Sequence, residues 1–290
     1  MRLLLVHGRA QEGKSSELLE QEWKKALSVG LRNASLQMRS DVKVDVPFYG
    51  DKLAELLARR DLPPADQIET RGGAIDGDYE EFLREVALEA REKDVVTTAE
   101  VQQELGPDAQ TKGPENWEWV QAVIRVIDRN VPGVSSTSIG ILLRDVFVYV
   151  NDGPVRRAIN KIVAEKLTSE PTVVIGHSLG SVVAYEVLRE HGQNKVSCYV
   201  TVGSPLGIRA IRRRLRTPLT MPKGVAGWYN AFDERDVVAL YPLDDTNFGI
   251  TPAIRNHAGV LNHTDNRHGI AGYLDNKDVA KEIHTAMSMA

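Results

Sequence analysis

Ser178 is the strongest candidate for chemistry, at the centre of the sequence Gly176-His177-Ser178-Leu179-Gly180. This G-x-S-x-G pattern follows an apolar run over residues 172–175, typical of a buried strand, and precedes a helical spacing over residues 182–190. A serine between a strand and a helix lies on a sharp turn, and the flanking glycines remove side chains that would collide with those elements. The pattern therefore predicts a nucleophile elbow that presents the hydroxyl above the carboxyl edge of a sheet.

A serine nucleophile needs a histidine as its base, and the histidine needs an acid that orients it. In elbow enzymes the acid follows the serine along the chain and the histidine comes last. We favour Asp236 as the acid, because it lies shortly after an apolar run over residues 228–232. Asp233 is the alternative acid, although its carboxylate could instead cap a turn.

Four histidines lie beyond the acid: His257, His263, His268 and His284. We favour His268, which precedes Gly269 on an expected loop where an imidazole can move. His263 is the second choice, and its other role would be that of a solvated loop histidine. His257 lies near a weak strand, and His284 falls inside the expected last helix.

The oxyanion of an acyl-transfer intermediate is stabilised by backbone N–H groups. We expect one donor at Leu179, at the N-terminus of the helix after the serine, where the helix dipole is positive. The second donor should follow the first strand, which ends at His7-Gly8. The N–H of Arg9 is the natural candidate, with that of Ala10 as the alternative.

The loop after the first strand also carries a competing pattern. Residues Gly8 to Ser15 match G-x-x-x-x-G-K-[ST], the pattern of a phosphate-binding loop between a strand and a helix. A nucleotide hydrolase would also need a strand that ends in an aspartate for magnesium. Residues 148–152 would supply it if that stretch were a strand, but residues 141–150 fit either a strand or a helix. Nucleotide hydrolysis therefore stays an alternative, as does a catalytically silent fold that only binds.

The composition is that of a globular protein. The chain has 290 residues, of which 42% are hydrophobic and 26% charged, and we expect one domain over residues 1–290. Its net charge of −4 lacks the basic excess of a nucleic-acid binder. No apolar stretch approaches the roughly 20 residues of a membrane span. A single cysteine, Cys198, excludes an intrachain disulfide, and we expect a cytoplasmic protein.

Strands and helices are expected to alternate along the chain. Apolar or alternating runs predict strands over residues 3–6, 42–46, 172–175, 196–202 and 228–232, with a weak strand near Ile254. Helical spacings lie between and after them, over residues 16–29, 117–127, 154–167, 182–190 and 278–287. This order predicts an α/β fold, a mostly parallel twisted sheet with helices on both faces.

Residues 61–112 differ in charge from the rest of the chain. They carry 14 Asp or Glu and 5 Lys or Arg, a net charge of −9, which leaves +5 for the other residues. Residues 79–90 have the spacing of an amphipathic helix, so we read residues 51–116 as a helical insert that covers the mouth of the Ser178 pocket. A solvated surface excursion is the alternative.

Two further patterns bear on ligands. Five arginines within residues 209–216 could meet an anionic group or form a solvated helix face. No Cys/His cluster has the spacing of metal ligands, and we expect neither a metal nor a cofactor.

Together these motifs resemble the α/β-hydrolase superfamily, of the serine esterase and lipase type. The chain is similar to bacterial proteins labelled alpha/beta hydrolases, and distantly to the GPI inositol-deacylase-like lipases. The resemblance is carried by His7-Gly8, the Ser178 elbow, residues 202–207, 228–230 and 236–238, and His268-Gly269. It implies cleavage of an ester or related acyl bond in a small molecule or lipid, through an acyl-serine. The chain departs from the superfamily in beginning at its third strand and in the early position of the insert.

Overall fold

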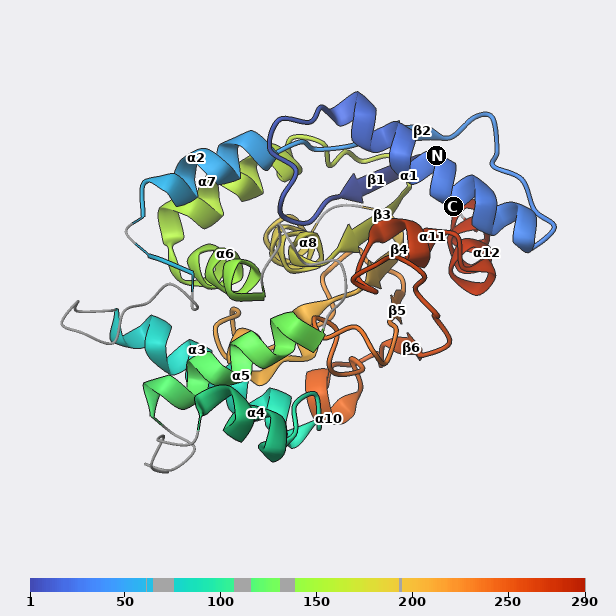
Figure 1. Cartoon of the computed structure of the whole chain (residues 1–290). Coiled ribbons are helices and arrows are strands. Elements are labelled where there is room, and N and C mark those ends of the chain that lie inside the picture. Colours follow the sequence, from blue (N-terminus) through green and yellow to red (C-terminus); the bar gives the residue numbers. More distant parts are fainter. Residues whose placement is uncertain (61, 65–75, 107–115, 131–138, 193–194, 290) are drawn as a thin grey trace.

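The computed structural model describes residues 1–60, 62–64, 76–106, 116–130, 139–192 and 195–289 (Figure 1). Its described strands form one parallel sheet in the order β2-β1-β3-β4-β5-β6. They are β1 (Arg2–Val6), β2 (Lys43–Asp45), β3 (Thr172–His177), β4 (Val196–Val202), β5 (Trp228–Ala231) and β6 (Arg255–His257). The predicted α/β fold with a parallel sheet is therefore confirmed.

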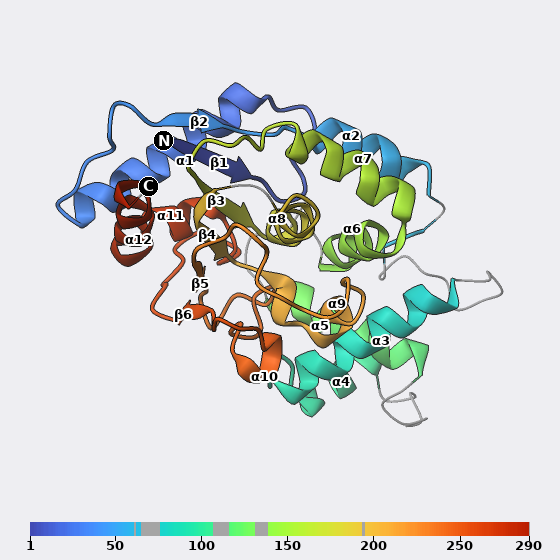
Figure 2. The ribbon, with the colours of Figure 1, turned by 180° about the vertical axis from the view of Figure 1, so that it is seen from behind.

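Helices cover both faces of the sheet because its central strands are apolar on both sides. In β1, Leu3 and Leu5 face one hydrophobic core, and Leu4 and Val6 face the other. The first core contains side chains of α1 (Ser16–Asn33), α11 (Ile270–Leu274) and α12 (Lys277–Ser288). The second contains side chains of α7 (Gly153–Ala164) and α8 (Leu179–Glu190), which Figures 1 and 2 show on the opposite side of the sheet. Each fully buried leucine contributes about 1.5–3 kcal/mol.

The ambiguous segment over residues 141–150 is helical. It lies within α6 (Ile139–Asn151), whose side chains are apolar around most of its circumference and are largely buried. The helix ends before Asp152, whose side chain accepts a hydrogen bond from the N–H of Val155 (2.9 Å) and caps α7. The strand that nucleotide hydrolysis would need at residues 148–152 is therefore not formed.

Over the described residues, four α-helices lie between β2 and α6. They are α2 (Gly50–Ala58), α3 (Gly77–Glu92), α4 (Thr98–Leu105) and α5 (Trp117–Asn130). Helix α3 contains the amphipathic spacing over residues 79–90, and its apolar side chains are buried. Figure 1 shows α3, α4 and α5 as one group, whereas α2 lies beside α7.

Three of the arginines within residues 209–216, namely Arg209, Arg213 and Arg214, bind the acidic side of α3. Glu89 is 1% exposed and accepts hydrogen bonds from the N–H groups of Arg209 (2.9 Å) and Ala210 (3.0 Å). These donors lie at the start of the short helix α9 (Arg209–Arg212). Further ion pairs join Glu85 to Arg213 and Arg214, and Glu92 to Arg209. Arg209 and Arg213 remain 40% and 65% exposed, so these arginines are a partly solvated face that also forms ion pairs. The pairs join acidic residues of the 61–112 segment to basic residues outside it.

Glu89→Gln should lower the free energy of unfolding by about 1–3 kcal/mol, because the amide loses one of the two acceptors for buried N–H donors. Urea unfolding measures the change. Glu81→Gln, at an exposed position of the same helix, is the matched control and should change stability by less than about 0.5 kcal/mol. Equal effects of the two substitutions would contradict this assignment.

Candidate active site

Ser178 lies at the turn between β3 and α8, with backbone angles φ 53° and ψ −130°. Non-glycine residues rarely adopt such angles, which indicates a strained turn held by its surroundings. Its N–H donates a hydrogen bond to the carbonyl of Val202 in β4 (3.2 Å). Its Oγ is buried and has no hydrogen-bond partner. The strand, sharp turn and helix predicted around Ser178 are thus present.

Two glycines of the elbow are required by close backbone approaches. A Cβ atom on Gly176 would lie 2.7 Å from Cα of Ser181, and one on Gly180 would lie 2.2 Å from the carbonyl oxygen of Val6. No side chain fits at either position. Gly8 is also near the serine, because a Cβ placed on it would lie 3.1 Å from Cβ of Ser178. The loop after β1 therefore begins directly beside the elbow.

Asp236 and His268 are joined by a hydrogen bond of 2.7 Å between Oδ2 and Nδ1. The carboxylate is buried, and it also accepts hydrogen bonds from the hydroxyl of Tyr273 (2.5 Å) and the N–H of Val238 (2.9 Å). With Nδ1 held by a carboxylate, the neutral imidazole has its lone pair at Nε2, the atom that would accept a proton. This Nε2 is buried without a partner.

The acid–base pair and the serine share one wall of the site. Val202 binds the N–H of Ser178, and the next residue, Gly203, lies against the pair: a Cβ on it would be 3.2 Å from both Oδ2 of Asp236 and Cε1 of His268. No hydrogen bond joins Ser178 Oγ to His268 Nε2 in this arrangement. Such bonds are often long in the absence of substrate and tighten when it binds.

Asp233, the alternative acid, has a different role in the structure. Its Oδ2 accepts a hydrogen bond from the N–H of Asn262 (2.8 Å), and its Oδ1 accepts one from the N–H of Arg235 (2.9 Å). Both contacts fix the loops that follow β5 and β6. The carboxylate therefore acts as a structural anchor, as the turn-capping reading proposed.

The other three histidines lie apart from Asp236. His263 is 62% exposed, and its hydrogen bond to Asp275 (2.5 Å) raises its pKa. His257 stacks on Tyr229, and His284 lies in the last helix, α12. Of the four candidate bases, the structure brings only His268 to the preferred acid.

His177 is a site residue that sequence reasoning gave no role. Its Nε2 lies 2.7 Å from the carbonyl oxygen of His268, and the two rings are 4.8 Å apart. Burial lowers its pKa to about 3, so the ring is neutral at ordinary pH and Nε2–H donates to that carbonyl. His177 thereby holds the loop that carries His268. As the variable residue of G-x-S-x-G, it carries no sequence signal for this contact.

The two expected oxyanion donors lie on either side of the elbow. Leu179 is the first residue of α8, at the positive end of the helix dipole. Arg9 follows Gly8 in the loop that His7 fixes, because Nε2 of His7 accepts a hydrogen bond from the N–H of Tyr49 (3.1 Å). Burial also lowers the pKa of His7, to about 4, so this ring is neutral as well.

An open pocket of about 340 Å³ lies beside Asp236. The loop of His268 contributes Asn266 and Arg267 to its walls, and the turn after α3 contributes Lys93, Asp94 and Val95. The turn at the end of α3 therefore reaches the pocket beside Asp236.

Comparison with known proteins agrees with the fold. A family model described as alpha/beta hydrolase fold matches residues 101–237, which include the Ser178 elbow and Asp236, whereas His268 lies beyond the match. The sheet around this segment is parallel and its elbow has the strained serine of that fold. The chain thus has the α/β-hydrolase fold, and its matched segment is similar to that superfamily. This likeness indicates a hydrolase.

Searches of curated proteins and of solved structures gave no match to this chain. None of its helices, over the residues described, has the length and hydropathy needed to cross a membrane.

The competing phosphate-binding pattern has other contacts in the structure. The N–H of Gly13 donates to the carboxylate of Asp51 (2.7 Å), a group that would repel a phosphate. Lys14 pairs with Glu22 (3.1 Å), and the side chain of Ser15 caps α1. These side chains serve the loop and the helix that follows it.

Lys14→Ala should therefore keep hydrolase activity within about threefold, which is under 1 kcal/mol of barrier. ATP or GTP with magnesium should not raise the melting temperature of the wild-type protein, whereas tight nucleotide binding would add about 2.7 kcal/mol at a hundredfold excess over Kd. A magnesium-dependent rise that disappears in Lys14→Ala would instead support nucleotide binding.

The half-buried, neutral His177 should make stability depend on pH. Its folded pKa is far below the unfolded value of about 6.5, so the unfolded chain binds an extra proton below that pH and stability falls as the pH falls. The stability advantage over His177→Gln should shrink by about 1.4 kcal/mol per pH unit between roughly pH 6 and 4. Urea unfolding of both proteins at several pH values measures this, and parallel stability curves would refute it.

Proposed function

We propose that the protein is a serine hydrolase that cleaves a carboxylic ester, or a related acyl bond, of a small molecule or lipid through an acyl-serine intermediate. One observation carries the proposal. The Asp236–His268 hydrogen bond of 2.7 Å lies against Gly203, and the preceding residue, Val202, binds the N–H of a strained serine whose Oγ is buried and unpartnered. Buried polar atoms without partners are uncommon in proteins, and here two of them belong to a nucleophile and a base.

In this mechanism, Oγ of Ser178 attacks the substrate carbonyl carbon while its proton passes to Nε2 of His268. Asp236 orients the imidazole and stabilises the imidazolium. The N–H groups of Leu179 and Arg9 donate hydrogen bonds to the oxyanion. The intermediate then expels the alcohol, which takes the proton from His268. Water attacks the acyl-serine by the same steps, and the carboxylic acid leaves.

Residues 1–290 are proposed to form one hydrolase domain, and the insert over residues 51–116 is proposed to act as its lid. Support comes from the turn after α3, whose residues 93–95 line the pocket beside Asp236. The ion pairs between α3 and residues 209–214 would hold such a lid in place. A lid of this kind would limit the entry of water and shape the acyl-binding region.

Matched substitutions test the assignment of the three catalytic residues. With 4-nitrophenyl butyrate as substrate, Ser178→Ala, His268→Ala and Asp236→Asn should each lower kcat by several orders of magnitude. The double variant of His268 and Asp236 should lose little more than either single variant, because the residues of a triad act as a unit.

The alternative residues provide the controls. His263→Ala should keep kcat within about threefold, since its side chain is exposed. The main effect of Asp233→Asn should be a lower free energy of unfolding, with a smaller effect on kcat, because its carboxylate anchors two loops. If Asp233→Asn lost activity while Asp236→Asn kept full activity, Asp233 would be the catalytic acid and Asp236 would not. Absence of hydrolysis in the wild-type protein toward a panel of short acyl esters would favour a catalytically silent fold.

A further inference from the structure

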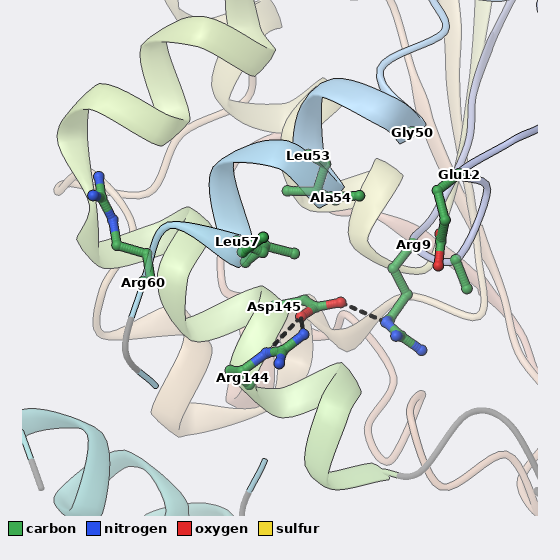
Figure 3. Close-up of a pocket in the computed structure, with 11 residues that line it drawn as sticks. Arg9, Glu12, Gly50, Leu53, Ala54, Leu57, Arg60, Arg144 and Asp145 are labelled. Atoms are coloured by element: carbon green, nitrogen blue, oxygen red, sulfur yellow. Dashed lines mark hydrogen bonds and ion pairs between the residues drawn. The ribbon is translucent and has the colours of Figure 1, made fainter. Parts of the chain in front are cut away.

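We propose that the pocket in Figure 3 is a subsite that binds a carboxylate group of the substrate through Arg9, with Arg144 beside it. The inference rests on the proposed function, because it names the class of ester that Ser178 would cleave.

The pocket has one apolar wall and one charged wall. Its volume is about 280 Å³. Helix α2 forms the apolar wall with Gly50, Leu53, Ala54, Leu57 and Ala58. Arg9 from the loop after β1, and Arg144 and Asp145 from α6, form the charged wall. These walls suit a small ligand with an apolar stem and a charged end.

Two arginines share one buried carboxylate on the charged wall. Nε of Arg9 lies 2.7 Å from Oδ2 of Asp145, and Nη2 of Arg144 lies 2.9 Å from Oδ1. Figure 3 shows the two guanidinium groups approaching Asp145 from opposite sides. One carboxylate balances only one of the two positive charges. The Arg9 side chain is 10% exposed and the Arg144 side chain 24%, so the excess charge is only partly solvated.

The other charged residues of the pocket do not supply the missing anion. Arg60 forms its own ion pair with Asp152 (2.5 Å). Glu12 lies at an exposed position of the pocket wall, where water screens its charge. The excess positive charge therefore remains with the Arg9–Asp145–Arg144 cluster.

Arg9 has an unused, buried hydrogen-bond donor. Its side chain is only 10% exposed, and its Nη1 is buried with no partner. A buried charged donor without an acceptor is costly to leave unpaired. Because Asp145 takes only Nε, the outer Nη1/Nη2 edge is the part of the guanidinium that can hold a carboxylate with two parallel hydrogen bonds.

The position of Arg9 connects this subsite to the serine. Its neighbour Gly8 approaches Cβ of Ser178, and its backbone N–H is the proposed oxyanion donor. A substrate whose carbonyl is bound at that N–H would have the guanidinium of the same residue within reach. The expected substrate is therefore a small ester that carries a carboxylate a few carbon atoms from the scissile carbonyl.

Calorimetric titration of the Ser178→Ala variant of residues 1–290 tests the subsite without turnover. Monoethyl succinate, an anion, should bind at least tenfold more tightly than the matched neutral diethyl succinate. Arg9→Lys in the same background should remove most of this preference, because an ammonium cannot present a planar pair of donors. Arg39→Lys, the same substitution at an exposed arginine that pairs with Asp41, is the matched control and should retain the preference.

Equal affinities for the two esters, or a preference that survives Arg9→Lys, would overturn the inference. Tighter binding of inorganic phosphate than of monoethyl succinate would also overturn it, because the site would then be one for phosphate. Failure of the proposed function would be seen separately, as no hydrolysis of 4-nitrophenyl butyrate by the wild-type protein, and would leave the binding result unaffected.

Discussion

The start of α8 and the end of β1 approach each other so closely that only glycine fits between them. A Cβ on Gly180 would lie 2.2 Å from the carbonyl oxygen of Val6 and 2.3 Å from that of His7. This contact fixes the helix against the sheet, and the turn that connects β3 to α8 must then take up strained backbone angles at Ser178. It also brings Gly8 and the Arg9 loop beside the serine. The nucleophile, both proposed oxyanion donors and the proposed carboxylate subsite therefore depend on one backbone approach.

The proposed acid and base are held by a second set of contacts, which come from loops at the carboxyl ends of the strands. Asp236 accepts hydrogen bonds from His268, Tyr273 and Val238, and these three donors fix the orientation of its carboxylate. His177 donates a hydrogen bond to the carbonyl of His268. Such buried networks are rigid when every member has a partner. The unpartnered atoms, Ser178 Oγ and His268 Nε2, are the two that the proposed reaction would use.

Much of this arrangement could be predicted from local sequence patterns. The G-x-S-x-G turn can be recognised in the sequence because close backbone approaches require glycine at these positions in any chain with this turn. The strands of the sheet could be predicted because they are apolar on both faces. The choice of Asp236 and His268 followed from chain order, and the structure brings these two together while it directs Asp233 and His263 to other partners.

Contacts between distant segments left no such pattern. Nothing local indicates that Tyr273 binds Asp236, that His177 holds the loop of His268, or that Glu89 accepts hydrogen bonds at the start of α9. Residues 141–150 were ambiguous because a fully buried helix and a buried strand are both continuously apolar. The sequence shows the negative charge of residues 61–112 and the arginines of residues 209–216 as two separate features. Only the fold pairs them.

The central claim is that Ser178 is an activated nucleophile. The most direct test is to treat the wild-type protein with a fluorophosphonate and to locate the adduct by peptide mass spectrometry. The account predicts one adduct per chain, on the peptide that contains Ser178, and none after prior denaturation, because activation requires the folded arrangement with His268. An adduct on another serine, or no adduct on the folded protein, would contradict it.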